Sequence, residues 1–222
     1  MKQLFPNVIK YWEKFPEATS ETLAMFFGSI FFIALFGIVI GVLLATMRPG
    51  GLLEQRVFYS LLSKVVNFFR AIPFVILIAL ALPFTRLVVG TAIGVRGAIV
   101  PIVVGMVPFV SRQVEQVLLQ VDGRLVDMAR TLGLGKGYII VKVLLNEGRA
   151  GIVRVLTICS ISLIGHTAMA GAVGGGGLGA LAIQYGYSRS MTDMTIACVA
   201  ILLVFVFFLQ WIGNTVAQAI EH

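Results

Sequence analysis

The chain has 222 residues, of which 59% are hydrophobic and only 12% are charged, and its mean hydropathy is +0.99. A soluble domain carries about 25% charged residues, so this composition excludes a chain whose whole surface faces water. At about 20 residues per span, the length leaves room for roughly four to six membrane-spanning helices. The sequence therefore predicts an all-α, polytopic membrane protein. We read the net charge of +7 first as a signal of topology, because basic residues gather at the cytoplasmic ends of spans.

Residues 1–20 mix lysines with glutamates and are interrupted by Pro6 and Pro16. Apolar and aromatic residues in this stretch could form a short amphipathic helix at the membrane interface. A partly ordered N-terminal tail is an equally good interpretation. The stretch lacks the basic start and short apolar core of a cleavable signal peptide, so we expect none.

A first span is predicted at residues 22–47, where the sequence is continuously apolar. Gly37 and Gly41 are separated by three residues, a spacing that lets two helices approach closely in a membrane. The sequence Arg-Pro-Gly-Gly at residues 48–51 ends this span, because proline and glycine interrupt helices.

A second span is predicted at residues 57–84, with a polar first half and an apolar second half around Pro73 and Pro83. Arg70 lies too deep for a loop residue, and two interpretations stay open. Its side chain either reaches the cytoplasmic interface or faces a polar interior. A third span is predicted at residues 87–110, where neighbouring helices must cover the backbone that several glycines and prolines expose.

A fourth span is predicted at residues 151–173 and a fifth at residues 194–219. The glycine-rich stretch at 171–179 is interpreted as an outer turn or a loop next to a gate. Although it contains Gly-x-Gly-x-x-Gly, it follows a span and not a strand, which argues against a dinucleotide site. We expect Asp193 to cap the start of the fifth span.

Polar residues recur at helical spacing in the fourth span: Ser160, Ser162, His166 and Thr167. We interpret His166 as a hydrogen-bonded interior residue in preference to a proton relay, with Ser162 and Thr167 as the expected partners. Cys159 and Cys198 lie within apolar runs and have no metal-ligand spacing, so they are interpreted as small packing residues. No metal site and no catalytic set are expected.

The most polar stretch is residues 112–154, which hold seven basic and four acidic residues between two apolar runs. This basic excess predicts a cytoplasmic location. With five spans, the N-terminus is then expected outside and the C-terminus inside. Within residues 112–154, a helix is predicted to end at the Gly133-x-Gly135-x-Gly137 turn, and a second, amphipathic helix is predicted at residues 138–145. Such a pair can present a knob to a groove in a partner protein, although a solvated loop is the alternative.

This stretch resembles the cytoplasmic motif of ATP-binding-cassette importer permeases, which reads Glu-Ala-Ala, three residues, Gly, nine residues, Ile, one residue, Leu-Pro. Seven residues stand at the fixed positions of the motif, in order Asp127, Met128, Ala129, Gly133, Val143, Leu145 and Asn146. The chain departs from the motif most clearly at its last position, where the helix-breaking proline is replaced by asparagine. The resemblance implies that residues 112–150 form the segment that couples the permease to an ATPase.

Four further segments, at residues 66–74, 82–94, 107–115 and 168–187, are similar to the methionine importer permeases of bacteria. This resemblance implies a type I importer permease fold over the whole chain, 1–222, in the cytoplasmic membrane. It also implies a homodimer around the pathway, two copies of an ATPase subunit that bind ATP and Mg²⁺, and an extracytoplasmic methionine-binding protein. Lipid is an expected partner and nucleic acid is not. The residues expected along the pathway are Ser162, His166 and, at its constriction, Met169.

Two other functions remain to be weighed. The same type of permease could carry another small amino acid or solute. An ion-coupled secondary transporter would need acidic residues at the midplane of its spans, and the first four predicted spans contain none. The sequence also lacks Gly-x-x-x-x-Gly-Lys-Ser/Thr, so ATP hydrolysis is expected in a separate subunit and this chain is not expected to be an enzyme.

Overall fold

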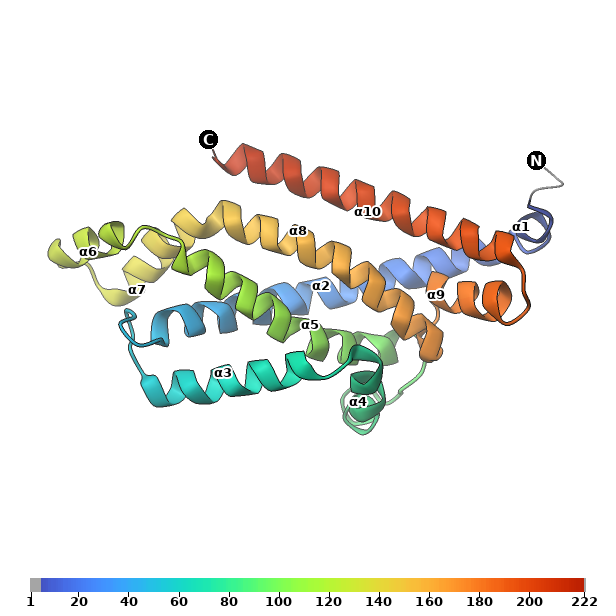
Figure 1. The fold of residues 1–222 in the computed structure, drawn as a ribbon, viewed down its shortest axis with the longest axis horizontal. Helices are drawn as coiled ribbons and strands as arrows, with labels where there is room; N and C mark the ends of the chain where they lie inside the picture. The colour runs from blue at the N-terminus through green and yellow to red at the C-terminus, as the bar shows by residue number, and fades with distance from the viewer. Residues whose placement is uncertain (1–4, 222) are drawn as a thin grey trace. The chain divides into compact units, whose positions relative to one another are not determined.

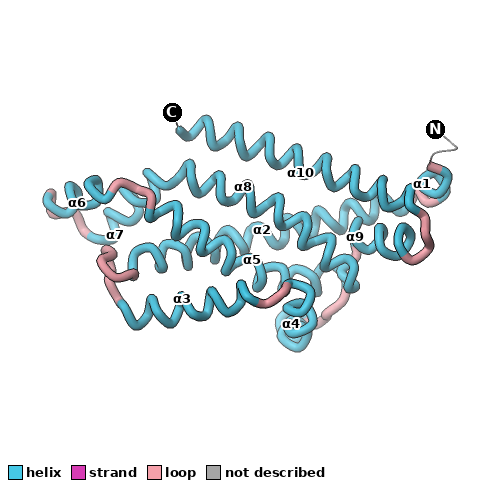
Figure 2. The backbone as a smooth tube through the Cα atoms, viewed as in Figure 1, coloured by secondary structure: helices cyan, strands magenta, loops and turns pink. Residues whose placement is uncertain are grey.

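The computed structural model describes residues 5–221, and these residues form helices and short connections without a strand (Figures 1 and 2). Residues 1–4 of the predicted tail and the terminal His222 lie outside the described part. The prediction of an all-α protein is confirmed. In chain order, the helices of the first half are α1 (Pro6–Lys10), α2 (Lys14–Met47), α3 (Arg56–Ala71), α4 (Phe74–Val89) and α5 (Gly94–Leu119).

The second half contains shorter elements and three π-helical segments, in which the helix has a wider turn. In chain order they are α6 (Gly123–Thr131), α7 (Lys136–Tyr138), η1 (Ile139–Leu144), α8 (Leu145–Ala170), η2 (Gly171–Gly175), α9 (Gly177–Leu181), η3 (Ala182–Tyr187) and α10 (Thr192–Glu221).

Four helical stretches of the described chain are long and apolar enough to cross a membrane: α2, α5, Lys136–Gly175 and Thr192–Ile220. The pair α3 and α4 adds a fifth if the two are counted as one broken span. The number is therefore consistent with the five predicted spans. The difference lies in the shape of the second one.

The predicted span at 57–84 is not one straight helix, because the chain bends by 112° between α3 and α4. Pro73 stands at the break with φ −57° and ψ 133°. Its ring disfavours helical backbone at Ile72, and it has no N–H to continue the hydrogen-bond ladder of α3. Helix α4 then runs to Val89 and ends at Gly90, which is left-handed at φ +77°. This turn takes Leu87 out of the third span, which begins at Gly94.

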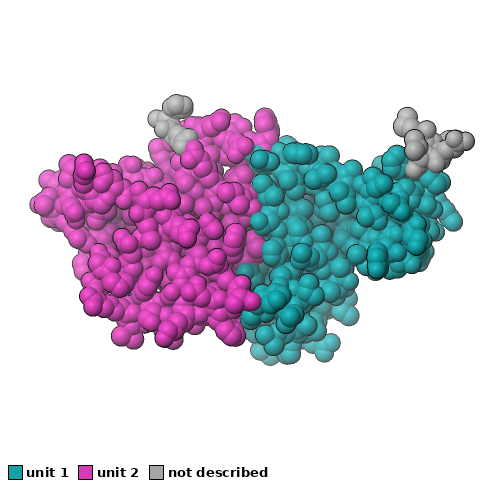
Figure 3. Space-filling model, viewed as in Figure 1, with its two compact units in different colours: residues 1–31, 72–105, 160–210 teal, residues 32–71, 106–159, 211–222 magenta. Residues whose placement is uncertain are grey.

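The described residues fall into two compact units (Figure 3). The first unit comprises residues 1–31, 72–105 and 160–210. Its core joins the start of α2 to α9 and the start of α10 through buried apolar side chains, namely Phe15, Ala18, Leu178, Leu181, Met194 and Cys198. Residues 14–20, predicted as part of the tail, therefore belong to a packed helix.

Asp193 is one residue inside α10, and its carboxylate binds the first turn of α1. It accepts hydrogen bonds from the backbone N–H of Asn7 at 2.8 Å, from Asn7 Nδ2 at 2.9 Å and from the N–H of Val8 at 3.3 Å. The expectation that Asp193 caps the fifth span placed it at the correct helix end but missed this partner. A short N-terminal helix does form, and the carboxylate on α10 satisfies its free N–H groups.

The second unit comprises residues 32–71, 106–159 and 211–222. Here Gly37 and Gly41 of α2 lie against α5. A Cβ atom at Gly37 would come within 2.6 Å of Val110 Cγ1, and one at Gly41 within 2.6 Å of Val114 Cβ. The predicted close approach is confirmed, with α5 as the partner helix.

Replacing Gly41 with alanine should destabilise the chain, because the new methyl group would meet Val114 and also the Ser111 carbonyl oxygen, 2.8 Å away. Overpacking of this kind costs about 1–3 kcal/mol. Thermal unfolding of the protein in detergent measures the change. The control is Gly135→Ala, since Gly135 has no atom within 4 Å of the added Cβ position. Equal melting temperatures for both variants would contradict the close α2–α5 contact.

Candidate functional site

The segment from α6 to η1, residues 123–144, is built around a helix with a defined start and end. Asp122 caps α6 by accepting a hydrogen bond from the N–H of Arg124 at 2.9 Å. At the other end Gly133 is left-handed, with φ +74°. Its N–H donates to Arg130 O at 2.9 Å, and the N–H of Leu134 donates to Ala129 O at 3.1 Å. These two bonds form a Schellman motif, so Gly133 reverses the chain after α6.

The inner side of the α6–η1 segment rests on the connection between α2 and α3. Leu52 of that connection, Ala129 of α6 and Ile139 of η1 form a small buried cluster, with Val126, Ile140 and Val143 packed around it. The connection is fixed by hydrogen bonds from the N–H of Leu53 to Thr46 O at 2.9 Å and from the N–H of Gln55 to Met47 O at 3.0 Å. The two segments are therefore packed together.

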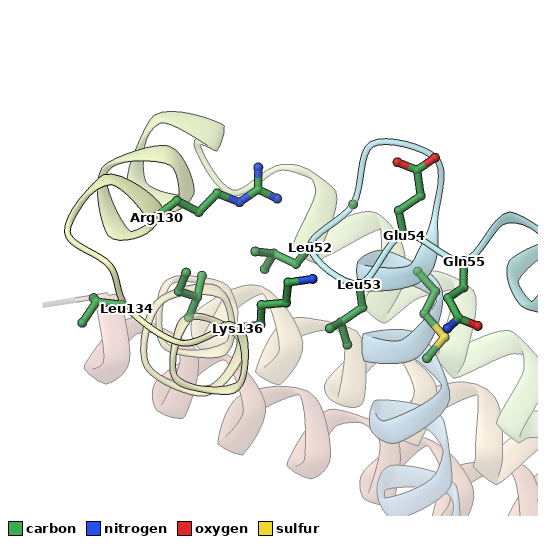
Figure 4. Close-up of a pocket in the computed structure, with 10 residues that line it drawn as sticks. Leu52, Leu53, Glu54, Gln55, Arg130, Leu134 and Lys136 are labelled. Carbon is green, nitrogen blue, oxygen red and sulfur yellow. The ribbon is translucent and has the colours of Figure 1, made fainter.

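A cavity of about 700 Å³ opens beside this cluster (Figure 4). Arg130 and Lys136 extend toward the loop that carries Leu52 and Leu53, while Glu54 stands on the loop itself. Arg56 Nε donates a hydrogen bond to Glu54 Oε1 at 2.7 Å, which holds the pKa of this exposed carboxyl below its usual value. The cavity thus combines an apolar floor with charged groups at its edge.

The seven residues of the importer motif divide between the inner and outer sides. Ala129 is buried in the cluster and Val143 packs against it, whereas Asp127 and Met128 are exposed. Asp127 lies 3.7 Å from Arg130 in a surface ion pair. Gly133 forms the turn described above.

The two remaining motif residues, Leu145 and Asn146, lie in α8, outside the cluster. The predicted separate helix at 138–145 is wrong, because α7, η1 and α8 follow one another without a gap from Lys136 to Ala170. Asparagine at 146 keeps the N–H that a proline would lack, so nothing breaks the ladder there. The departure from α-helical bonding lies in η1 instead, where the N–H of Leu145 donates to Ile140 O, one residue further back than in an α-helix.

The outer side of the α6–η1 segment carries apolar side chains that the described part of the chain leaves exposed. Leu132 is 76% exposed and Met128 61% exposed. Four other large apolar side chains here are also exposed, namely Leu125, Leu134, Tyr138 and Val141. An exposed apolar patch outside the predicted spans is typical of a protein interface. The sequence analysis missed most of these residues and the loop residue Leu52; an apolar pair (Leu52–Leu53) in a short polar connection was the available signal.

The three expected pathway residues share one face of α8, since Ser162, His166 and Met169 are spaced four and three residues apart. His166 Nδ1 lies 2.8 Å from Ser162 O, and because a carbonyl only accepts, this nitrogen carries the proton. The His166 ring packs edge-on against Phe74 of α4, with ring centroids 4.4 Å apart. Ser162 is thus confirmed as a partner, whereas Thr167 donates to Ile164 O at 2.8 Å.

The glycine-rich stretch after α8 forms a tight reversal. Gly174, Gly176 and Gly177 all have positive φ, and α9 begins at Gly177. The carboxylate of Glu21 accepts from the N–H of Gly177 at 2.6 Å, and Thr22 Oγ1 accepts from the N–H of Leu178 at 2.9 Å. Helix α2 therefore holds the turn that follows the Met169 face, a role that sequence analysis did not assign to either residue.

Comparison with known proteins places this geometry in a family. The model of the binding-protein-dependent transport system inner membrane component matches residues 37–222. The chain belongs to this family. Its members are transport subunits, so the predictions of a permease and of a multi-pass inner-membrane protein are confirmed.

Individual members of the family match nearly the whole chain. It is 38% identical over 213 residues to the probable D-methionine transport system permease protein MetI of Pasteurella multocida, covering 96% of this chain and 98% of that one. It is 39% identical over 222 residues to the methionine import system permease protein MetP of Bacillus subtilis, covering 99% of this chain and 98% of that one.

Solved structures share the fold of this chain. The chain matches an inward-facing conformation of the MetNI methionine ABC transporter with a TM-score of 0.89 and 41% identity, covering 94% of this chain and 97% of that one. An amino acid ABC transporter, 19% identical over 97% of this chain and 98% of that one, shares the fold with a TM-score of 0.74. The predicted importer permease fold is confirmed.

Replacing Gly133 with valine should disrupt the end of α6, because a β-branched residue is strained at positive φ even though the space around Gly133 is open. We expect normal membrane insertion and a loss of transport of at least about tenfold, equivalent to about 1.4 kcal/mol. Uptake in membrane vesicles measures it.

Two controls accompany this variant. Asparagine tolerates left-handed backbone, so Gly133→Asn should retain most of the transport. Gly135 has φ −64°, so Gly135→Val introduces the same side chain without the strain. Full transport by Gly133→Val would refute the role of the turn.

Proposed function

We propose that this chain is the permease subunit of an ATP-driven, binding-protein-dependent importer of methionine, acting as a single permease domain of which two copies enclose the pathway. The observation that carries the proposal is the α6–η1 segment: a motif shared with importer permeases, buried on one side and apolar but uncovered on the other. Methionine is favoured over other small solutes because the relatives that match nearly the whole chain are named methionine permeases.

The α6–η1 segment would bind a groove in an ATPase subunit, one per permease copy. Its exposed apolar residues, Leu132 and Met128 foremost, would be buried in that groove. ATP and Mg²⁺ would be held by the ATPase. Because Ala129 and Ile139 pack on Leu52, a movement of α6 would carry the α2–α3 connection with it.

The pathway would run along the α8 face that carries Ser162, His166 and Met169. Several neighbours on this face, Ile158, Gly165 and Val173 among them, are exposed in the single chain. A second copy related by twofold symmetry would cover them. With Nδ1 bound to Ser162 O, His166 has Nε2 as its remaining polar atom for a polar group of the substrate, and Met169 offers a soft, adaptable contact for the substrate side chain.

Orientation follows from charge. The α6–η1 segment and the start of α8 are rich in arginine and lysine, so we place them in the cytoplasm, with the N-terminus outside and the C-terminus inside. An extracytoplasmic binding protein would then deliver methionine to the opposite face.

The test of this function is co-purification of the tagged permease expressed with its genomic neighbours. An ATPase subunit in equal amount, together with ATP-dependent methionine uptake in liposomes, is the expected result. A chain that purifies alone and transports in response to an ion gradient would overturn the proposal.

The docking surface has its own test, the charge substitution Leu132→Asp. A buried carboxylate without a partner is strongly unfavourable, so the amount of co-purified ATPase should fall at least about tenfold. The conservative Leu132→Met should retain the ATPase. Equal recovery with Leu132→Asp would show that this face is not the docking surface.

The dimer axis can be tested with Met169→Cys. Met169 is 49% exposed, and two copies of a residue close to a twofold axis can form a disulfide when their Cα atoms are within about 7 Å. The native Cys159 and Cys198 are both fully buried and should not interfere. We expect an oxidised dimer on a non-reducing gel. The control is Val204→Cys on α10, where Val204 is 66% exposed and therefore at least as accessible. Cross-linking of this control variant alone would place the axis elsewhere.

A further inference from the structure

Most residues of helix α3 are exposed, and among the five that are not, two are polar, namely Tyr59 and Ser63. Its large apolar side chains, including Val57, Leu61 and Phe68, are exposed, and Val66 is the one residue of α3 that is buried. Lipid tails are as apolar as these side chains, so burial gives little energy to hold α3 against its neighbours in a membrane. Its position must depend largely on polar contacts.

The contacts come from a buried ion pair on α5. Arg112 and Glu115 lie one turn apart, with Arg112 Nη1 2.6 Å from Glu115 Oε2, and their side chains are only 12% and 5% exposed. A buried pair is stable only when its remaining donors and acceptors also find partners. The other groups of this pair bind α3.

Each member of the pair has its own partner on α3. Arg112 Nη2 donates to Ser63 O at 3.1 Å and also contacts Ser63 Oγ. Tyr59 donates its hydroxyl hydrogen to Glu115 Oε1 at 3.2 Å. Tyr59 and Ser63 are four residues apart and lie on one face of α3. Arg112 and Glu115 are three residues apart and lie on one face of α5, so these contacts join one face of each helix.

The two helices so joined lead to different parts of the chain. Helix α5 ends at Leu119 and is followed after three residues by α6. Helix α3 ends at Ala71, next to the break at Pro73 that leads into α4. The contacts between α3 and α5 therefore link the helix that leads into α6 to the helix that ends at the bend between α3 and α4.

We propose that the network of Tyr59, Ser63, Arg112 and Glu115 is a positioning element that makes α3 move together with α5 when the ATPase moves α6. This inference rests on the proposed docking of α6 to an ATPase. Without the network, ATP would still be hydrolysed, but α3 would no longer follow and transport would be lost.

The test is the double variant Tyr59→Phe/Ser63→Ala in the intact complex, reconstituted with its ATPase and binding protein. It removes both α3 hydroxyls, so that only the bond from Arg112 Nη2 to Ser63 O still joins the pair to α3, and it keeps the Arg112–Glu115 pair, so no buried charge loses its ionic partner. We expect ATPase activity and co-purification near those of the wild type, and roughly five times more ATP hydrolysed per methionine transported, within the usual range for residues that couple two sites. Ser60→Ala, on the exposed face of α3, is the matched control.

An unchanged ratio in the double variant would overturn the inference while leaving the proposed function intact. Failure of the wild-type complex to contain an ATPase or to import methionine would instead refute the proposed function. If the double variant does not assemble, Tyr59→Phe alone should still raise the ratio about twofold.

The movement of α3 gives a second readout, which would not change if the network only stabilised the fold. A fluorophore on Ser60→Cys should respond to ATP in the wild-type background, since the native cysteines are buried. In the double variant this response should disappear, while a probe on Thr131→Cys of α6 still responds. A response of both probes in the double variant would contradict the inference.

Discussion

Helices in lipid gain little by burying apolar side chains against one another, and this constraint shapes the structure. Each unit is held where backbones approach closely or where polar groups bond. In the second unit, Gly37 and Gly41 allow α2 to meet α5, and the Arg112–Glu115 pair binds α3. In the first unit, Glu21 binds the backbone at Gly177. Many large apolar side chains face outward, while a smaller set that includes Phe15, Leu178 and Met194 packs in the core of the first unit.

The α6–η1 segment obeys a different rule, because it lies outside the predicted spans. In the cytoplasmic location that we propose, water surrounds this segment and the hydrophobic effect acts on it fully. Ala129 and Ile139 accordingly pack on Leu52, as in a soluble domain. The same effect makes the exposed Leu132 unfavourable in isolation and favourable in a complex. The segment thus has one side packed against its own chain and one exposed side, which we propose is covered by a partner.

Much of this could be predicted from sequence where a single residue type has a specific local consequence. Gly133 was placed at the end of a helix, and the structure shows the left-handed turn that only glycine readily supplies. Long-range pairings could not be predicted in this way. Nothing near Asp193 in sequence indicates that it binds Asn7, and nothing near Arg112 indicates Ser63. Pro73 was noted, but whether a proline kinks a span or breaks it depends on packing that sequence does not contain.

The π-helical segment η1 has a further consequence for the register of the chain. A turn with bonds to the fifth preceding residue holds one residue more than an α-helical turn. Removing one residue between Ile139 and Leu144 and restoring α-helical bonding would leave the flanking helices in nearly their present relative rotation, because the extra residue is what makes this turn wide. A one-residue deletion in a regular α-helix would instead rotate everything before it by about 100°. The wide turn thus lets the chain hold an extra residue here while Gly133 and the exposed face of α6 keep nearly the same side.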